Sequence, residues 1–156
     1  MGKEIERKFL VINRMYEEMA AESFPIKQAY IAKEGEATVR IRVSGNRAWL
    51  TVKGRNKGAL RSEWEYEIPV REAEEMVAEL AGGWSVEKER YIVEYEGWKW
   101  EVDSFGGVLS GLIIAEIEMP SAESRPPLPA FIGKEVTGDV RYYNSVLATA
   151  GSRPED

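Results

Sequence analysis

Residues 4–11 of the chain read EIERKFLV, a stretch in which charged and apolar residues alternate. Side chains of an extended segment point alternately to its two faces. Glu4, Glu6 and Lys8 therefore share one face, whereas the opposite face is mostly apolar. The stretch predicts a β-strand that has one apolar face and one face made of charges.

The same alternation recurs along the chain, and residues of like charge follow one another at i, i+2. Such neighbours lie only about 7 Å apart on one face of a strand. In chain order the charged residues of these rows are Arg40, Arg42, Lys53, Arg61, Glu63, Glu65, Glu67, Lys88, Arg90, Glu101, Asp103, Glu116 and Glu118.

Like charges at this spacing repel one another unless an ion of opposite sign lies between them. For carboxylates that ion is a divalent cation, and for Arg and Lys it is a phosphate. The alternative is a set of antiparallel strands with one solvated polar face. Solvated faces usually mix Thr, Ser and Gln with the charges, so these rows favour a charged interior.

The composition excludes several kinds of chemistry. The 156 residues, of which 44% are hydrophobic and 31% charged, are typical of one globular domain. The chain has no histidine and no cysteine, which excludes a His base, a Cys nucleophile, disulfides and the usual zinc ligands. The remaining carboxylates favour Mg²⁺ or Mn²⁺. A net charge of −6 argues against a nucleic-acid partner.

The sequence also predicts where the protein is found. No apolar run approaches the ~20 residues that a membrane span needs, and the first residues lack an apolar signal core. The absence of cysteine fits a reducing compartment. We expect a cytoplasmic protein without a membrane partner.

Local patterns predict eight strands, three helical segments and a hairpin turn at residues 44–46. The clearest helix covers residues 71–81, a short one lies near 14–21, and Asp139 caps a final helix over 140–150. The predicted strands cover residues 3–11, 26–32, 36–43, 47–53, 61–68, 86–95, 98–103 and 112–119.

Eight strands suffice to close an antiparallel sheet into a barrel with a usable interior. We expect a mostly β fold of the α+β class, in which flanking helices and a C-terminal helix accompany the barrel. The aromatic residues of the strands are too bulky for that interior, so the charges face inward. Helices or a partner subunit then cover the apolar outer face, which is compatible with a homodimer. The predicted domain spans residues 1–150, and residues 151–156 are expected to be a disordered tail.

The opening Glu-x-Glu-x-Lys pattern resembles the start of the CYTH superfamily, the triphosphate tunnel metalloenzymes. This pattern and the further motifs given next are each weak alone, but their order and spacing together are specific, and they span roughly residues 2–150. The further matching motifs are Gln28-Ala29-Tyr30, Arg40-x-Arg42, Thr51-x-Lys53, Arg61-x-Glu63-x-Glu65, Lys88-x-Arg90, Glu101-x-Asp103, Glu116-x-Glu118, Gly133-Lys134-Glu135-Val136-Thr137 and Arg141-Tyr142-x-Asn144.

The resemblance implies an eight-stranded tunnel that binds triphosphate between a basic half and an acidic, metal-binding half. The expected catalytic residues are Lys88, Glu6 and Glu118. The expected substrate-binding residues are Lys8, Arg40, Arg42, Lys53, Arg61, Arg90 and Arg141. The expected metal ligands are Glu4, Glu6, Glu63, Glu65, Glu101, Asp103, Glu116 and Glu118. For Arg141 the alternative is a terminal helix that only packs against the barrel.

The expected activity is hydrolysis of the terminal phosphate of inorganic tripolyphosphate, with nucleoside triphosphates as further candidate substrates. Without His or Cys, the simplest nucleophile is a water activated by one of two Mg²⁺ or Mn²⁺ ions, and Lys88 orients that water or protonates a nearby oxygen. Two related activities, those of a class IV adenylyl cyclase and of a thiamine triphosphatase, stay open. A polyphosphate- or nucleotide-binding module without catalysis is a third alternative.

Overall fold

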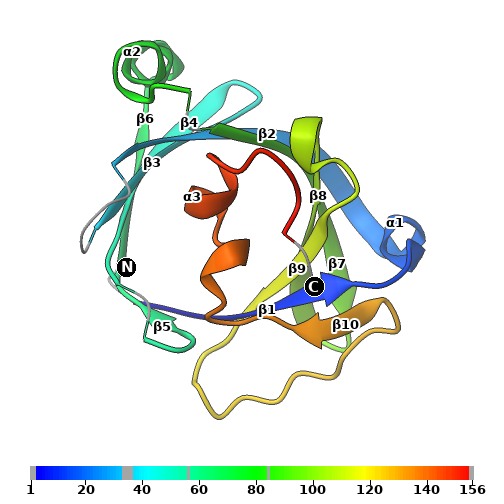
Figure 1. Ribbon diagram of the computed structural model, residues 1–156. Helices are drawn as coiled ribbons and strands as arrows, with labels where there is room; N and C mark the ends of the chain where they lie inside the picture. Colours follow the sequence, from blue (N-terminus) through cyan, green and yellow to red (C-terminus); the bar gives the residue numbers. More distant parts are fainter. Residues whose placement is uncertain (1–2, 33–36, 56, 84, 155–156) are drawn as a thin grey trace.

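A single curved antiparallel sheet of ten strands surrounds the centre of the molecule in the computed structural model (Figure 1). The structure describes residues 3–32, 37–55, 57–83 and 85–154. The strands are β1 (Glu4–Val11), β2 (Ala20–Ala32), β3 (Thr38–Ser44), β4 (Arg47–Lys53), β5 (Leu60–Arg61), β6 (Glu63–Ile68), β7 (Ser85–Tyr95), β8 (Trp98–Phe105), β9 (Ile113–Glu118) and β10 (Ile132–Glu135).

The strand order explains how the sheet nearly closes. The main path runs β10-β1-β9-β8-β7-β2-β3-β4-β6. The short strand β5, which immediately precedes β6, pairs with the start of β1 through Glu4 opposite Arg61. Because β5 and β6 are consecutive in the chain, this pairing brings the last strand of the path back to the first. The result is a nearly closed barrel.

The register of the strands places the charged rows on one side of the sheet. Residues directly opposite each other on neighbouring strands point to the same face. Arg40 lies opposite Thr51, which lies opposite Glu65 on the next strand. On the other side of the barrel, Glu116 on β9 lies between Lys8 and Glu101. The inward-facing charges predicted from the sequence are thus confirmed.

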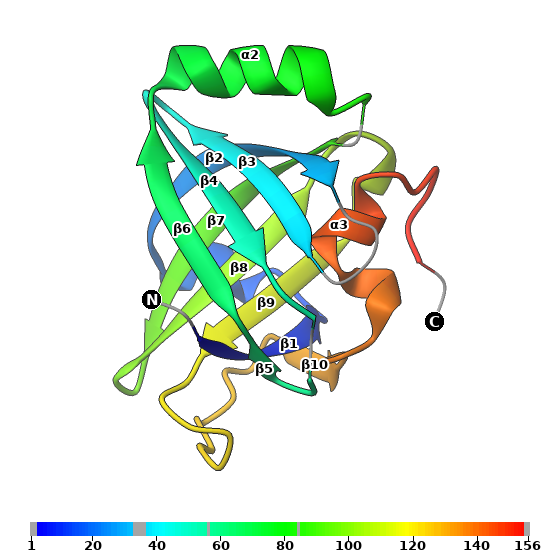
Figure 2. The ribbon, with the colours of Figure 1, turned by 90° about the vertical axis from the view of Figure 1, so that its left-hand side faces the viewer.

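Apolar residues on the outer face of the barrel pack under two helices. Tyr16 of the helix α1 (Met15–Met19) and Phe131, just before β10, cluster with Trp100, Phe9 and Val102, each almost fully buried. The helix α2 (Val70–Leu80) lies across β3 and β4 (Figure 2), and its buried Ala73 belongs to the same apolar cluster as Ile41 of β3. Aromatic bulk therefore lies outside the barrel, as the sequence predicted.

The C-terminal part of the chain fills one end of the barrel. It contains the 3₁₀ helix η2 (Val140–Tyr142) and the short helix α3 (Asn144–Leu147), and Figure 1 shows α3 within the ring of strands. A separate 3₁₀ helix, η1 (Gly107–Leu109), connects β8 to β9. Tyr142 and Leu147 are buried in an apolar cluster with Phe105 and Ile114 from the strands. This cluster forms the floor of the remaining interior space.

Several predicted boundaries were wrong. The short strands β5 and β10 were not predicted, so ten strands replace the expected eight. The first helix stops at Met19, and β2 starts at Ala20 instead of residue 26. The single helix expected over 140–150 is two short pieces, although Asp139 does cap the first of them. The expected strand start at Glu36 lies outside the described residues.

The predicted hairpin turn is confirmed. Ser44 pairs with Arg47, and Gly45 at the turn has a φ of +61°, a conformation that favours glycine. The clearest predicted helix is confirmed as α2, one residue from its expected bounds. Of the helices in the described residues, none has the length and apolar character needed to cross a membrane.

Candidate active site

A cavity of about 210 Å³ opens inside the barrel, and charged side chains make up most of its wall. The cationic residues of the wall are Lys8, Arg40, Arg42, Lys53, Arg61, Lys88 and Arg90. Its carboxylates are Glu4, Glu6, Glu63, Glu65, Glu101, Glu116 and Glu118. The neutral residues are Gln28, Tyr30, Thr38, Thr137, Gly138, Tyr143, Asn144 and Ser145.

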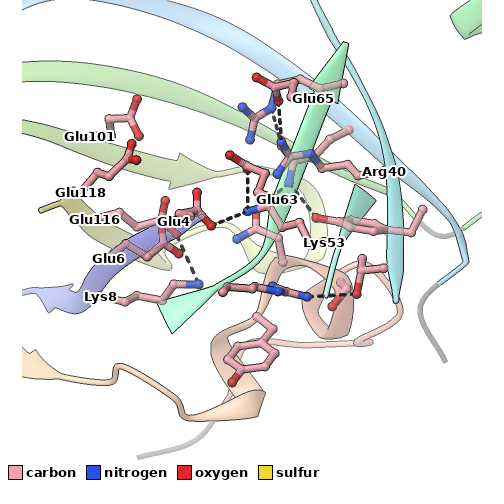
Figure 3. Close-up of a pocket in the computed structure, with 18 of the residues that line it drawn as sticks. Glu4, Glu6, Lys8, Arg40, Lys53, Glu63, Glu65, Glu101, Glu116 and Glu118 are labelled. Carbon is pink, nitrogen blue, oxygen red and sulfur yellow. Dashed lines mark hydrogen bonds and ion pairs between the residues drawn. The ribbon is translucent and has the colours of Figure 1, made fainter. Parts of the chain in front are cut away.

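Most charges in this cavity are segregated by sign. The exceptions include Glu63 and Glu65 on β6, which lie 3.5 Å from Lys53 and 3.3 Å from Arg40. We call Arg40, Arg42, Lys53, Arg61, Lys88 and Arg90 the basic half, and Glu4, Glu6, Glu101, Glu116 and Glu118 the acidic half. The basic residues come mainly from β3, β4 and β7, and the acidic ones come from β1, β8 and β9. Figure 3 shows the five glutamates of the acidic half together, with Arg40 and Lys53 across from them.

Asp103 anchors two cations of the basic half. Its carboxylate accepts two hydrogen bonds from Arg90, at 2.8 and 2.9 Å, and lies 2.6 Å from Lys88 Nζ. All three side chains are buried. Burial opposes the ionisation of Asp103, but the charges of Arg90 and Lys88 outweigh it and hold its pKa well below the usual range.

Arg42 has no carboxylate partner in the part of the chain that the structure describes. Its Nε donates to Gln28 Oε1 at 2.9 Å, a neutral acceptor. Burial and repulsion from the guanidinium groups of Arg40 and Arg90 lower the pKa of Arg42 to about 10. Nearby, Arg40 Nε is buried without a hydrogen-bond partner. Glu65 lies 3.3 Å from Arg40, but the charge of Arg42 is not compensated by a carboxylate of the described residues, and a bound anion would compensate it.

The acidic half lacks positive charge in the same way. Burial, followed by repulsion from Glu116 and Glu4, raises the pKa of Glu6 to about 8. By contrast, Glu4 and Glu116 each have a lysine partner: Lys53 Nζ lies 3.1 Å from Glu4, and Lys8 Nζ lies 3.3 Å from Glu116. Glu6 has no ion-pair partner among the described residues, so a bound cation would supply the positive charge that stabilises its ionised form.

Glu116 differs sharply from Glu6 although the two are close. Burial opposes its ionisation, but the positive charge of Lys8, with smaller contributions from Lys88 and Arg90, lowers the pKa of Glu116 to about 2. At neutral pH Glu116 is therefore ionised, whereas Glu6 is mainly protonated. The two halves of the cavity meet at this residue.

The donor set of the acidic half fits a hard divalent cation. Its ligating atoms are carboxylate oxygens, which Mg²⁺ and Mn²⁺ prefer. Across the described residues, no three acidic side chains are already gathered into a metal-binding group. A cation bound beside Glu6 would favour its ionised form and reverse the rise of its pKa.

Two predicted site residues lie elsewhere. Asp103 was expected to bind metal, but it is enclosed behind Lys88 and Arg90 and does not line the cavity. Arg141 was expected to bind substrate, but its guanidinium pairs with Asp139 at 2.7 Å on the outside of the barrel end. Asp103 is only 2% exposed, so its carboxylate is not accessible to a ligand in the cavity. The other predicted residues all line the cavity.

Some residues of the wall were missed by the sequence reasoning. Thr38 shares the inward face with Arg40 at i, i+2, a signal that could have identified it. Thr137, Tyr143 and Asn144 come from the irregular C-terminal segment, where no strand periodicity exists. Lys8 Nζ also donates to the carbonyl of Tyr142 at 3.1 Å, so this segment contacts the cations directly.

Comparison with known proteins places the chain in a family. The CYTH domain model matches residues 2–143. An inorganic triphosphatase of Acetivibrio thermocellus is 47% identical over 147 residues, which cover 94% of each chain. An inorganic triphosphatase of Nitrosomonas europaea is 36% identical over 149 residues, covering 93% of this chain and 96% of the relative.

Solved structures agree with this placement. The crystal structure of an inorganic triphosphatase matches with a TM-score of 0.64 and 34% identity, covering 97% of this chain and 99% of that one. A Hippeastrum protein with a dominant triphosphatase activity shares the fold, with a TM-score of 0.60 and 16% identity over 77% of this chain and 81% of its own. The matching motifs, the charged barrel and these relatives agree, and the chain belongs to the CYTH family.

Proposed function

We propose that this protein hydrolyses the terminal phosphoanhydride bond of inorganic tripolyphosphate in a metal-dependent reaction. The observation that carries the proposal is the cavity wall, where a basic half short of negative charge faces an acidic half short of positive charge. A triphosphate together with divalent cations would supply both. The two curated relatives are named inorganic triphosphatases, which supports the same substrate class.

The basic half would bind the phosphate oxygens. The guanidinium groups of Arg40 and Arg42 can each donate two parallel hydrogen bonds to a phosphate, which favours arginine at such sites. Arg61 and Lys53 also line the cavity, and Lys53 Nζ lies 3.5 Å from Glu63. Lys8 adds a cation on the acidic side, where it also holds Glu116.

The acidic half would hold the metal. Membership of the CYTH triphosphatases implies metal dependence in general. The residues that would hold the ions are Glu4, Glu6, Glu116 and Glu118, with Glu101 and Glu63 beside them. When bound, a divalent ion lowers the pKa of a water molecule and offsets phosphate charge.

Lys88 would move or hold a proton at its Nζ. Burial is the main cause that lowers its pKa to about 7, and the nearby charges of Arg90 and Arg42 act in the same direction against the attraction of Asp103. A lysine with a pKa near neutrality can donate or accept a proton at neutral pH. We therefore expect Lys88→Ala to lower kcat by roughly 10²-fold or more while KM changes little.

We propose two Mg²⁺ or Mn²⁺ ions, because the carboxylates extend from Glu4 to Glu101 along the cavity wall. The cysteine-free sequence supports a cytoplasmic location. A homodimer is compatible with the exposed Trp64 and Tyr66 on the outer face of β6.

An assay of product formation tests the proposed function. The protein is incubated with tripolyphosphate, thiamine triphosphate or ATP, each with Mg²⁺, Mn²⁺ or EDTA. We expect orthophosphate and pyrophosphate from tripolyphosphate at the highest rate, and no release in EDTA. Cyclic AMP and pyrophosphate from ATP would identify a cyclase instead. Tight tripolyphosphate binding without phosphate release in either metal would identify a binding module and overturn the proposal.

A further inference from the structure

Asn144, the first residue of α3, contacts the centre of the basic half. Its Oδ1 accepts a hydrogen bond from Lys88 Nζ at 2.9 Å and another from Gln28 Nε2 at 3.1 Å. A lysine ammonium can only donate, so the atom facing it must be the amide oxygen. The orientation of the Asn144 amide is therefore determined by its partner.

The two acceptors of Lys88 come from different parts of the fold. Asp103 on β8 lies 2.6 Å from Nζ, and Asn144 on α3 lies 2.9 Å from it. An ammonium group has three N–H donors. With two of them directed to Asp103 and Asn144, one is left, and Lys88 lines the cavity. The pair of acceptors thus determines which way the third donor points.

The same amide oxygen connects Lys88 to the phosphate-binding arginines. Gln28 is 1% exposed, and it donates both to Asn144 and to the hydroxyl of Tyr30. Its own oxygen accepts from Arg42 Nε. A displacement of Asn144 would therefore be transmitted to Lys88 directly and to Arg42 through Gln28.

Asn144 is held firmly enough for this purpose. Leu147, in the same helix, and Tyr142, just before it, are 1% and 2% exposed in the apolar cluster at the barrel end. The carbonyl of Tyr142 also accepts a hydrogen bond from Lys8. Because packed interiors yield little, α3 holds Asn144 at a constant distance from the strands.

We propose that Asn144 is a positioning residue that acts on the reaction through Lys88. Its oxygen and that of Asp103 orient Nζ so that the remaining N–H faces the reacting phosphate. The C-terminal segment thereby completes the site that the strands begin. This inference rests on the proposed function, since it assigns Lys88 the proton-handling role given above.

The test is a double-mutant cycle between Asn144 and Lys88. The variants are Asn144→Ala, Lys88→Met, the double variant and Asn144→Asp, with Val146→Ala on the exposed side of α3 as the matched control. Steady-state kinetics are measured with whichever triphosphate the wild-type protein hydrolyses. Thermal unfolding of each variant verifies that the fold persists.

We expect Asn144→Ala to lower kcat by about 10- to 100-fold while KM changes by less than about threefold, as for a mispositioned reacting group. In the Lys88→Met background the same substitution should have no further effect, because the group it positions is gone. Asn144→Asp keeps an oxygen acceptor but adds a charge that raises the pKa of Lys88, so kcat should recover at a higher pH, and KM should rise through repulsion of the substrate. Val146→Ala should equal the wild type.

Two results would overturn the inference. The first is wild-type kcat in Asn144→Ala. The second is an equal fold-loss of kcat in the wild-type and Lys88→Met backgrounds, which is what a merely structural role predicts. The proposed function is tested separately by the wild-type products, because the cycle depends only on ratios between variants.

Discussion

The two halves of the cavity are built from the same kind of strand but leave opposite charges unmet. In the basic half, Asp103 pairs with both Lys88 and Arg90, whereas Arg42 has no carboxylate partner among the described residues and donates to the neutral Gln28. In the acidic half, lysines neutralise Glu4 and Glu116, whereas Glu6 has no ion-pair partner among the described residues.

This difference allows the protein to be stable and still bind a charged ligand. Most charges in each half are paired within the protein, which limits the desolvation cost of burying them. Arg42 and Glu6 have no ion-pair partner within the described part of the chain. The pKa of Arg42 is lowered and that of Glu6 is raised, so both shifts favour the neutral form. Paired groups hold the cavity together, and unpaired groups attract the ligand.

The largest expected effect concerns the paired groups. Asp103→Ala leaves Lys88 and Arg90 buried without their shared counter-charge, so it should destabilise the fold by about 3–5 kcal/mol. Urea unfolding at neutral pH measures this loss. The matched control is Glu67→Ala, which removes a bidentate partner of Arg47 on the exposed surface and should have little effect. Equal losses for the two variants would contradict the role of Asp103.

The next effect concerns the unpaired arginine. Arg42→Met removes donors to the phosphate, and we expect KM for tripolyphosphate to rise about 10- to 100-fold, in line with hydrogen bonds to a charged group. It also removes the repulsion from Arg40 and Arg90, so stability should not fall. Arg47→Met, an exposed arginine outside the cavity, serves as the control in both assays. A destabilised Arg42→Met protein with a normal KM would contradict the prediction, because Arg42 would then stabilise the fold and not bind the substrate.

The smallest effect concerns Glu6 and pH. In EDTA, the unfolded chain releases this proton near the ordinary pKa of 4.5, whereas the folded protein retains it up to about 8. The folded state binds more protons between those values, so stability should fall as pH rises from 5 to 8. We expect Glu6→Gln to remove roughly 1–2 kcal/mol of that fall.

The difference between the wild type and Glu6→Gln isolates this group from other titrations. Chemical unfolding at pH 5, 6.5 and 8 gives the two curves. Mn²⁺ should stabilise the wild type most at pH 8, where it replaces the proton, and should stabilise Glu6→Gln less. Parallel curves with and without metal would argue against a cation site beside Glu6.

The inward face of the barrel could be predicted because strand periodicity makes it explicit. Arg40 and Arg42 are two residues apart, as are Glu116 and Glu118, so each pair must share a face. Since like charges repel on any surface, their repetition on successive strands indicated an interior that binds ions. The predicted catalytic, substrate-binding and metal-binding residues all line the cavity except Asp103 and Arg141.

The exceptions depend on distances that a single strand does not encode. Asp103 shares a face with Glu101, but it is buried beside Arg90 and Lys88 and therefore acts as their counter-ion. Asn144 and Tyr143 reach the cavity because α3 packs into the barrel end. Short pairings such as that of β5 with β1 have too few residues to show a period.

One cavity is expected to bind a triphosphate at its basic half and a cation at its acidic half. A crystal soaked with Mn²⁺ and a non-hydrolysable triphosphate analogue tests it most directly, because the anomalous signal of manganese locates the metal. The account predicts manganese beside Glu6 and Glu118, with phosphate oxygens at Arg40 and Arg42. Manganese and phosphate bound only on the outside of the barrel would contradict it.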